Sequence, residues 1–197
     1  MSGRTVRPTS AQIDAQMLDL TAGLLAQHGV QAMSVSMVAT ASGYSKAGVF
    51  RRFGDKDALV DATLRRCVQI GHEALERVEH EASPAHRQST AARVMLDAAL
   101  DWPGFIALAL ASITVREHDE FGGRLDELGD ALLRMFDLPP LDEIDDVAPL
   151  FRALAALSSI SVLSLFHRDI TDTATAKKVI LETAEAVLQA HPDAATE

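Results

Sequence analysis

The sequence predicts an all-α protein of about nine helices. Apolar residues recur at three- and four-residue spacing along most of the chain, as on the buried face of a helix. Serine, threonine or aspartate stands before several of these segments, and glycine or proline stands after several of them. No segment shows the alternation of apolar and polar residues that is typical of a strand. These three observations predict helices packed on helices.

The first elements are predicted to be a flexible tail over residues 1–9 and a helix from about Ser10 to Gly29, where glycine acts as a breaker. The apolar face of this helix is expected to consist of Ile13, Met17, Leu20 and Leu24. A short helix then begins near Val35. It ends in a turn at Gly43, because glycine can adopt a positive φ without a Cβ clash.

Two capped helices are predicted after this turn. Ser45 precedes a helix over residues 46–52, and its hydroxyl can accept from the N–H groups of the first turn. Asp55 is placed in the same way before a long helix that continues to about Glu81. The remaining helices are expected at residues 88–100, 104–115, 120–137, 147–167 and 173–190.

The helix over residues 46–52 has one apolar side and one basic side. Val49 and Phe53 lie four residues apart and are expected to face the core. The opposite side carries Lys46, Gly48, Phe50, Arg51 and Arg52. Positive charge, with small residues near the start, suits a helix that enters the major groove of DNA. Lys56 lies in the first turn of the next helix, where a cation and free N–H groups can hold a phosphate.

Residues 16–59 resemble the N-terminal domain of the TetR family of transcriptional repressors. The residues that carry the resemblance, without a gap, are Gln27-His28-Gly29-Val30, Ser34-Val35, Val38-Ala39, Ser42-Gly43, Ser45-Lys46, Phe50, Phe53-Gly54 and Asp55-Lys56-Asp57-Ala58-Leu59. The resemblance implies a helix-turn-helix DNA-binding domain over residues 10–56, and a ligand-binding and dimerisation domain over residues 57–197. It implies a homodimer whose partners are a palindromic double-stranded DNA operator and a small-molecule effector. The positions that it assigns to DNA binding are Ser34, Ser36, Ser45, Lys46, Ala47, Gly48, Phe50, Arg51, Arg52 and Lys56.

Four of these positions depart from the family. Phe50 stands where the family often has a tyrosine that reaches a phosphate, so it is expected to pack on a sugar or a thymine methyl. Gly48 stands where threonine or another small residue is common, and glycine inside a helix costs about 1 kcal/mol relative to alanine. Either close approach of the backbone to DNA or a tolerated loss of helix stability would explain a glycine at this position. Arg51 and Arg52 replace residues that are frequently histidine or aromatic, and each can read guanine or hold a phosphate.

The charge is distributed unevenly along the 197 residues, whose formal net charge is −10. Residues 1–56 contain six basic and three acidic side chains, a net charge of +3, whereas the rest contains 12 basic and 25 acidic ones, a net charge of −13. A basic head on an acidic body would orient the molecule toward a polyanion. An acidic body that only maintains solubility is the alternative explanation for the second part.

The penultimate helix, over residues 147–167, has two apolar stripes and needs cover on more than one side. One stripe can face the core, and the other can face a second copy, with Ala153 and Ser164 near its margins allowing close approach. The residues predicted at this dimer interface are Phe151, Ser158, Val162 and Phe166, with Val179, Thr183 and Val187 on the last helix. A helix that is fully buried in a monomer is the alternative.

The effector is predicted to be apolar or aromatic. If the family's pocket lies among the middle helices, its candidate lining residues are Trp102, Phe105, Leu108, Phe121 and Phe151, although ordinary core packing explains each of them equally well. The pattern Glu-x-x-His and the usual zinc-hydrolase and nucleotide-binding motifs are absent from the sequence. We therefore predict no catalytic residue, no metal site and no cofactor. A helical small-molecule-binding or metal-dependent enzyme without DNA binding is the alternative function.

The compartment is predicted to be the cytoplasm. The start of the chain contains Arg4, Arg7 and Pro8 without an apolar stretch, so it does not read as a secretory signal. The most apolar segment, residues 147–166, includes Arg152 and several serines and is too polar to predict a membrane span. The single cysteine, Cys67, is expected to be a small buried apolar group in a reducing environment.

Overall fold

The computed structural model describes residues 8–83, 86–114, 125–166 and 172–189. Within these ranges the chain forms helices joined by turns, and no strand is present in them. The helices are α1 (Ser10–Ala32), α2 (Val35–Ser42), α3 (Lys46–Phe53), α4 (Lys56–Glu81), α5 (Arg87–Asp101), α6 (Pro103–Thr114), α8 (Asp126–Met135), α9 (Val147–Phe166) and α10 (Thr173–Gln189), with a 3-10 turn at Leu141–Glu143. The prediction of an all-α fold is confirmed.

Local signals place most helix ends where the sequence predicts them. Thr9 and Gln12 form a reciprocal capping box at the start of α1, and Asp55 accepts a hydrogen bond from the Ala58 N–H at 2.8 Å at the start of α4. The predicted break at Gly29 is confirmed. Gly29 has a φ of 71° and is not helical, so the long first segment of α1 ends there and a short second segment follows the kink to Ala32.

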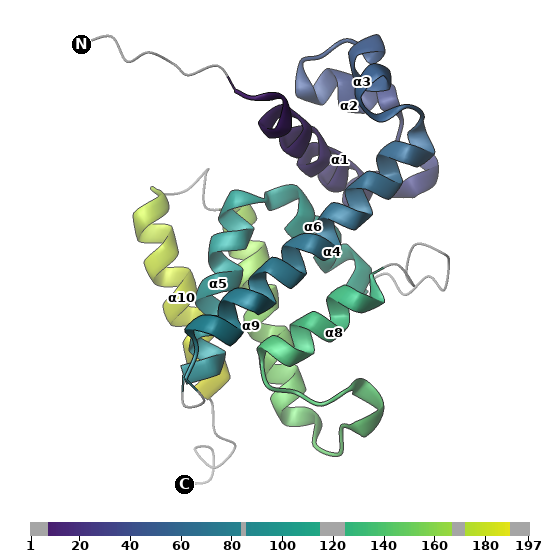
Figure 1. Cartoon of the computed structure of the whole chain (residues 1–197). Coiled ribbons are helices and arrows are strands. Elements are labelled where there is room, and N and C mark those ends of the chain that lie inside the picture. The colour runs from purple at the N-terminus through teal and green to yellow at the C-terminus, as the bar shows by residue number, and fades with distance from the viewer. Residues whose placement is uncertain (1–7, 84–85, 115–124, 167–171, 190–197) are drawn as a thin grey trace, which may run out of the picture.

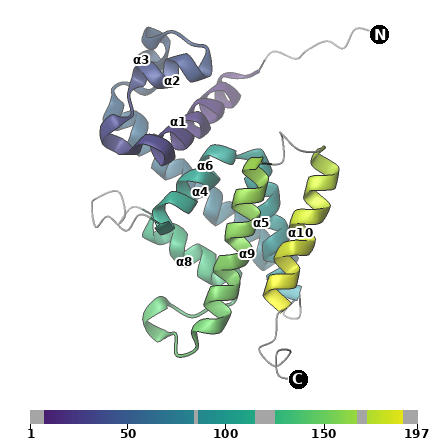
Figure 2. The ribbon, with the colours of Figure 1, turned by 180° about the vertical axis from the view of Figure 1, so that it is seen from behind.

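The helices are arranged as a small head and a larger body, connected by α4 (Figure 1). The head contains α1, α2, α3 and the start of α4, and α4 runs from there across the body. In the body α4 packs against α5 and α8, while α9 packs against α5, α6 and α10. Seen from behind, α9 and α10 lie side by side on the surface (Figure 2).

Two apolar clusters hold this arrangement together. One lies within the body and includes Val78, Met135, Phe136, Ile160 and other buried residues of α4, α5, α8, α9 and α10. The other begins in the head and continues through α4 to Phe105 and Leu108 of α6 and to Leu125 and Leu128 at the start of α8. The head therefore shares its core with the body. The exact division at residue 56 stays a prediction.

The buried face of α1 differs from the expected one. Met17 is 1% exposed, and Thr21, Ala22 and Leu25 are buried with it, but Leu20 is 37% exposed. The face is rotated because α1 packs on α6 and α4 as well as on α2, and residues 17, 21 and 25 point toward that joint core.

α1 and α6 cross at close range. A Cβ built on Gly104 would lie 1.8 Å from the main-chain oxygen of Asp19, a distance that no side chain can occupy. Gly23 faces the same crossing, because its own built Cβ would lie 3.6 Å from the Gly104 Cα. The Asp19 carboxylate also accepts a hydrogen bond from the Phe105 N–H at 3.0 Å. A side chain of the head thus caps the first turn of a body helix.

α9 is the one described helix that is long and apolar enough to cross a membrane, judged by length and composition alone. The pair α5 and α6 passes the same test only if it is counted as one span with a 114° bend. α9 contributes Ala153, Ala156, Leu157, Ile160 and Ser164 to the buried face of the body. Core packing therefore explains part of the apolar character of α9.

Cys67 is buried on α4, as the sequence predicts, and is 3% exposed. Burial raises the pKa of its thiol to about 12, and the negative charge of Asp19 adds to this effect. In the unfolded chain the thiol would titrate near its ordinary value of about 8.5. The stabilisation from keeping a neutral thiol inside is therefore complete below that pH and is lost as the pH rises toward 12.

This burial predicts a protected and pH-sensitive thiol. Iodoacetamide should alkylate Cys67 at pH 8 only as fast as the protein opens, and rapidly in denaturant. Above about pH 9 the free energy of unfolding should fall by roughly 1 kcal/mol more per pH unit than in Cys67→Ala, because only the unfolded thiol ionises. Urea unfolding at a series of pH values measures this difference. Rapid alkylation of the folded protein would contradict it.

Candidate nucleic-acid interface

The two helices of the head that face solvent, α2 and α3, are held by caps and a glycine turn. Ser34 accepts from the Met37 N–H at 3.3 Å and starts α2, and Ser45 accepts from the Gly48 N–H at 3.1 Å and starts α3. Between them Gly43 has a φ of 72° and ends α2 in the left-handed conformation. These bonds define a helix-turn-helix whose second helix begins at Lys46.

The buried side of α3 fixes the helix on the head. Val49 is fully buried in the core shared with α1, α2 and α4, and Phe53 is half-buried against the same cluster. Burying a side chain of this size contributes about 1.5–3 kcal/mol. The exposed side of α3 is therefore presented on an anchored helix.

The outward side of α3 is basic and aromatic. Lys46, Ala47, Phe50 and Arg51 are exposed on it, and Phe50 retains 41% of its accessible surface. The Lys46 Nζ lies 5.8 Å from the centre of the Phe50 ring, in a cation–π arrangement that brings the ammonium and the ring together. Arg51 makes no ion pair with any described residue. This surface, which we call the α3 outer face, offers two cations and one exposed ring.

Gly48 is half-buried rather than fully open. A Cβ at this position would lie 3.2 Å from the Ser45 Oγ, which itself accepts the Gly48 N–H. The N-cap therefore explains part of the preference for glycine here, a reason that the sequence alone does not indicate.

The remaining predicted DNA-binding residues lie outside the α3 outer face. Ser36 is exposed on α2, and Ser34 and Ser45 use their hydroxyls as caps. Lys56 is half-buried, and its Nζ donates to the Gln31 carbonyl at 3.2 Å, near the end of α1. Arg52 turns back toward α1, where it pairs with Asp14. Arg52 therefore does not lie on the α3 outer face.

Tyr44 is an exposed residue of the helix-turn-helix that the sequence analysis missed. It lies in the turn between α2 and α3, it is 40% exposed, and the Arg52 guanidinium is 5.9 Å from its ring centre. The sequence does contain a signal for this residue, because an aromatic ring with a hydroxyl group stands directly after the turn glycine, Gly43.

Three of the five predicted effector-binding residues pack together in the described part of the chain, but as part of the core. Phe105 and Leu108 are each 1% exposed and pack in the core between α6, α1 and α4. Trp102 joins them in an edge-to-face arrangement with Phe105, and the Arg66 guanidinium lies 5.5 Å from the centre of its ring. Phe151 is 62% exposed on α9, so it does not share their cluster, and Phe121 lies outside the described residues. The prediction of Phe151 as a lining residue is therefore not supported by its position.

The predicted dimer residues lie on an exposed apolar surface of α9 and α10. Phe151, Val162 and Phe166 are 62%, 41% and 60% exposed on α9, and Val179 is 52% exposed on α10. Ser158 and Thr183 are also exposed, and Val187 is half-buried.

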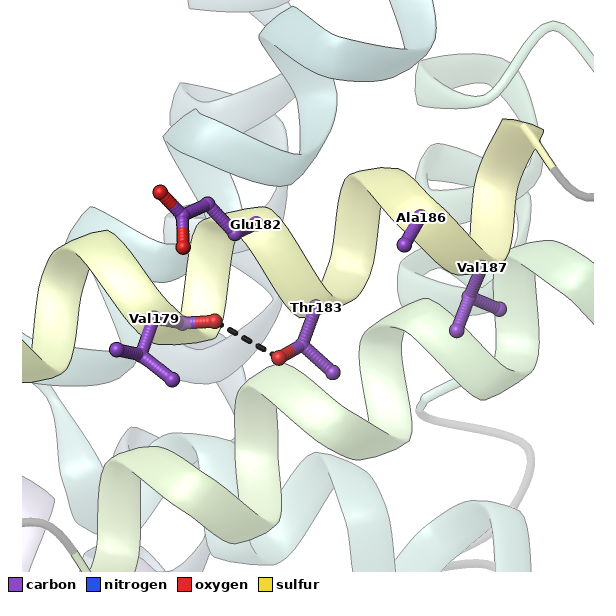
Figure 3. A pocket seen from close by; sticks show the side chains of 5 residues that line it. All are labelled: Val179, Glu182, Thr183, Ala186 and Val187. Carbon is purple, nitrogen blue, oxygen red and sulfur yellow. Dashed lines mark hydrogen bonds between the residues drawn. The ribbon is translucent and has the colours of Figure 1, made fainter.

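On α10 a shallow groove of about 560 Å³ is lined by Val179, Glu182, Thr183, Ala186 and Val187, beside α9 (Figure 3). Ala153 and Ser164, expected near this surface, are instead buried in the body at 3% exposure, because that side of α9 packs on the core.

The comparisons with known proteins agree with this geometry. Residues 17–63 match the sequence profile of "Bacterial regulatory proteins, tetR family". The head of this chain is therefore similar to the N-terminal domain of the TetR family. The match covers α1 from Met17, all of α2 and α3, and the start of α4, which is the region that positions the α3 outer face. No curated protein sequence matches the chain.

Solved structures share the TetR fold over nearly the whole chain. A TetR-family transcriptional regulator from Bordetella parapertussis has a TM-score of 0.66 at 14% identity, with 94% of this chain and 98% of that one covered. AibR, solved in complex with isovaleryl coenzyme A and operator DNA, has a TM-score of 0.60 at 19% identity, covering 89% of this chain and 97% of its own. The ketosteroid regulator KstR2 of Mycobacterium tuberculosis has a TM-score of 0.58 at 16% identity, with coverage of 94% and 97%. At these identities the TetR fold is what is shared.

Proposed function

We propose that this protein is a TetR-family transcriptional repressor that binds a palindromic DNA operator as a homodimer and is released by a small apolar or aromatic effector. The observation that carries the proposal is the α3 outer face. Lys46, Phe50 and Arg51 are exposed together on a helix that is anchored from behind by Val49. The cations can hold phosphates or guanine, and the ring can pack on a sugar or a thymine methyl.

The homodimer is supported by the exposed apolar surface of α9 and α10. Exposed apolar side chains gathered on adjacent helices are typical of an interaction surface. If two copies pair through these helices, four helices form an intermolecular bundle with the heads at its ends. Two α3 helices would then enter successive major grooves about 34–36 Å apart, as in other dimeric helix-turn-helix proteins.

The release mechanism is supported by the path of α4. This helix begins in the head at Lys56 and packs in the body against α8, where a Cβ on Gly71 would lie 2.4 Å from the Leu128 Cδ1. A ligand that separates α8 from α4 would therefore move the helix that bears the head. A coupling of about 1–3 kcal/mol would change operator affinity about 5- to 150-fold.

Selection of bound sequences from a random pool of DNA duplexes tests the function directly. We expect a consensus with two-fold symmetry, and binding that weakens steeply between about 50 and 200 mM salt. Selected operator can then be titrated with a panel of acyl and aromatic compounds, which should release it. Failure to enrich any sequence would overturn the proposal, and a monomer that converts a small molecule would favour an enzyme instead.

Arg51→Ala is expected to weaken binding to the selected operator about 10-fold or more and to lower the salt slope by about one. If Arg51 reads guanine, the variant will also lose preference at one base pair in each half-site. Fluorescence anisotropy at several salt concentrations measures both effects. Arg93→Ala, which removes a cation from α5 of the body, is the control and should change neither.

A further inference from the structure

Arg52 is the one predicted DNA-binding cation of α3 whose charge is already satisfied within the head. Its Nη1 donates to the Ser10 Oγ at 3.0 Å and to the Asp14 carboxylate. Ser10 and Asp14 lie one turn apart at the start of α1, so the guanidinium reaches from the end of α3 to a single face of that helix. The Cζ of the same guanidinium lies 5.9 Å from the centre of the Tyr44 ring.

The neighbouring arginine provides the contrast. The Arg52 side chain is only 20% exposed, whereas Arg51 is exposed and has no ion-pair partner among the described residues. A phosphate would have to compete with the Asp14 carboxylate for Arg52, and it would meet the repulsion of that carboxylate. The same obstacle does not exist for Arg51 or Lys46.

The position of Arg52 also gives it a mechanical role. α3 has eight residues, and Val49 and Phe53 attach its buried side to the core. The contacts of Arg52 attach the C-terminal turn of α3 to a second point, the N-terminal end of α1. Two points of attachment on different sides fix the angle of a short helix such as α3. A single point would allow the helix to change its angle on the head.

We infer that Arg52 is a positioning residue that sets the angle of α3 on the head through Asp14, rather than a residue that contacts DNA. This inference rests on the proposed function, because it concerns how the α3 outer face is presented to DNA. It assigns a role in operator recognition to Asp14, an acidic residue on a different helix that no DNA-binding pattern would select.

A double-mutant cycle separates positioning from contact. The variants are Arg52→Ala, Asp14→Ala, the combination of both, and the exchange Asp14→Arg with Arg52→Asp. We expect each single variant to lower operator affinity about 5- to 10-fold, and the combination to lower it no further, because both remove the same interaction. The salt slope should stay that of the wild type, and the exchange should restore most of the affinity.

A direct DNA contact predicts different results. Arg52→Ala would then lower the salt slope by about one, and Asp14→Ala would leave affinity unchanged or raise it by removing a competing carboxylate. That pattern would overturn the inference. Arg93→Ala is the matched control, because it breaks an ion pair of similar kind, to Glu81 at the far end of α4 from the head, and should not alter operator affinity.

Hydrogen exchange of the α3 amides keeps the inference testable if the wild type binds no DNA at all. That result would end the proposed function but not the positioning role. Arg52→Ala and Asp14→Ala should both lower the protection of the α3 amides, by similar amounts, while Arg51→Ala leaves it unchanged. Unchanged protection in the first two variants would overturn the positioning role as well.

Discussion

Gly104→Ala is expected to lower the free energy of unfolding by about 2–3 kcal/mol, although alanine is the better helix former. The added Cβ would lie 1.8 Å from the Asp19 carbonyl oxygen and 2.7 Å from its carbonyl carbon. These are main-chain atoms, so the clash cannot be relieved by turning a side chain. α1 and α6 would have to separate, which weakens the bond from the Phe105 N–H to Asp19 and opens the core around Phe105 and Leu108.

Urea unfolding followed by circular dichroism measures this loss, and Gly129→Ala is the matched control. Gly129 lies in α8, and a Cβ built there meets nothing within 4 Å. This control should be as stable as the wild type or more stable by up to about 1 kcal/mol, since alanine favours the helix. Equal stability of the two alanine variants would show that α1 and α6 do not cross as closely as described.

Val162→Asp is expected to abolish the dimer at micromolar protein concentration and to lower operator affinity on the order of 100-fold. Val162 is 41% exposed near the middle of the apolar surface of α9, with Ser158 one turn before it and Phe166 one turn after it. In a two-fold bundle the same position would come from both copies, so the variant would bury two carboxylates without partners. Losing the dimer also removes the second α3 helix from the operator.

Sedimentation velocity measures the oligomeric state of this variant, and anisotropy measures its operator affinity. Gln69→Asp places the same charge on an exposed position of α4 and should leave the dimer intact. A wild-type protein that is a monomer at all concentrations would contradict the proposed assembly. A Val162→Asp protein that remains dimeric would place the interface elsewhere.

The local structure of the head could be predicted from the sequence. The start of α3 after Ser45, the start of α4 after Asp55 and the turn at Gly43 lie where the sequence predicts them. Each depends on a side chain and a backbone group within a few residues of one another, so the pattern of residues contains the whole interaction. The exposure of Lys46 and Arg51 likewise follows from the period of a helix whose Val49 is buried.

The direction of Arg52 shows where that reasoning stops. Periodicity places Arg52 beside Arg51 on a basic helix, but its partner Asp14 is 38 residues away in the chain. Two stripes of α9 were equally apolar in sequence, and packing on α5, α6 and α10 decided that Ala153 and Ser164 are inside while Phe151 and Phe166 are outside.

The sequence by itself therefore determined the helical fold, most of the helix boundaries and the family of the head, because caps, turns and apolar spacing act within about four residues. Only the tertiary structure decided which arginine faces outward, which side of α9 stays exposed, and how closely α1 approaches α6. The bond that joins Asp19 to Phe105 spans 86 residues of chain. Contacts of that kind depend on how whole helices are arranged in space, and no local pattern encodes them.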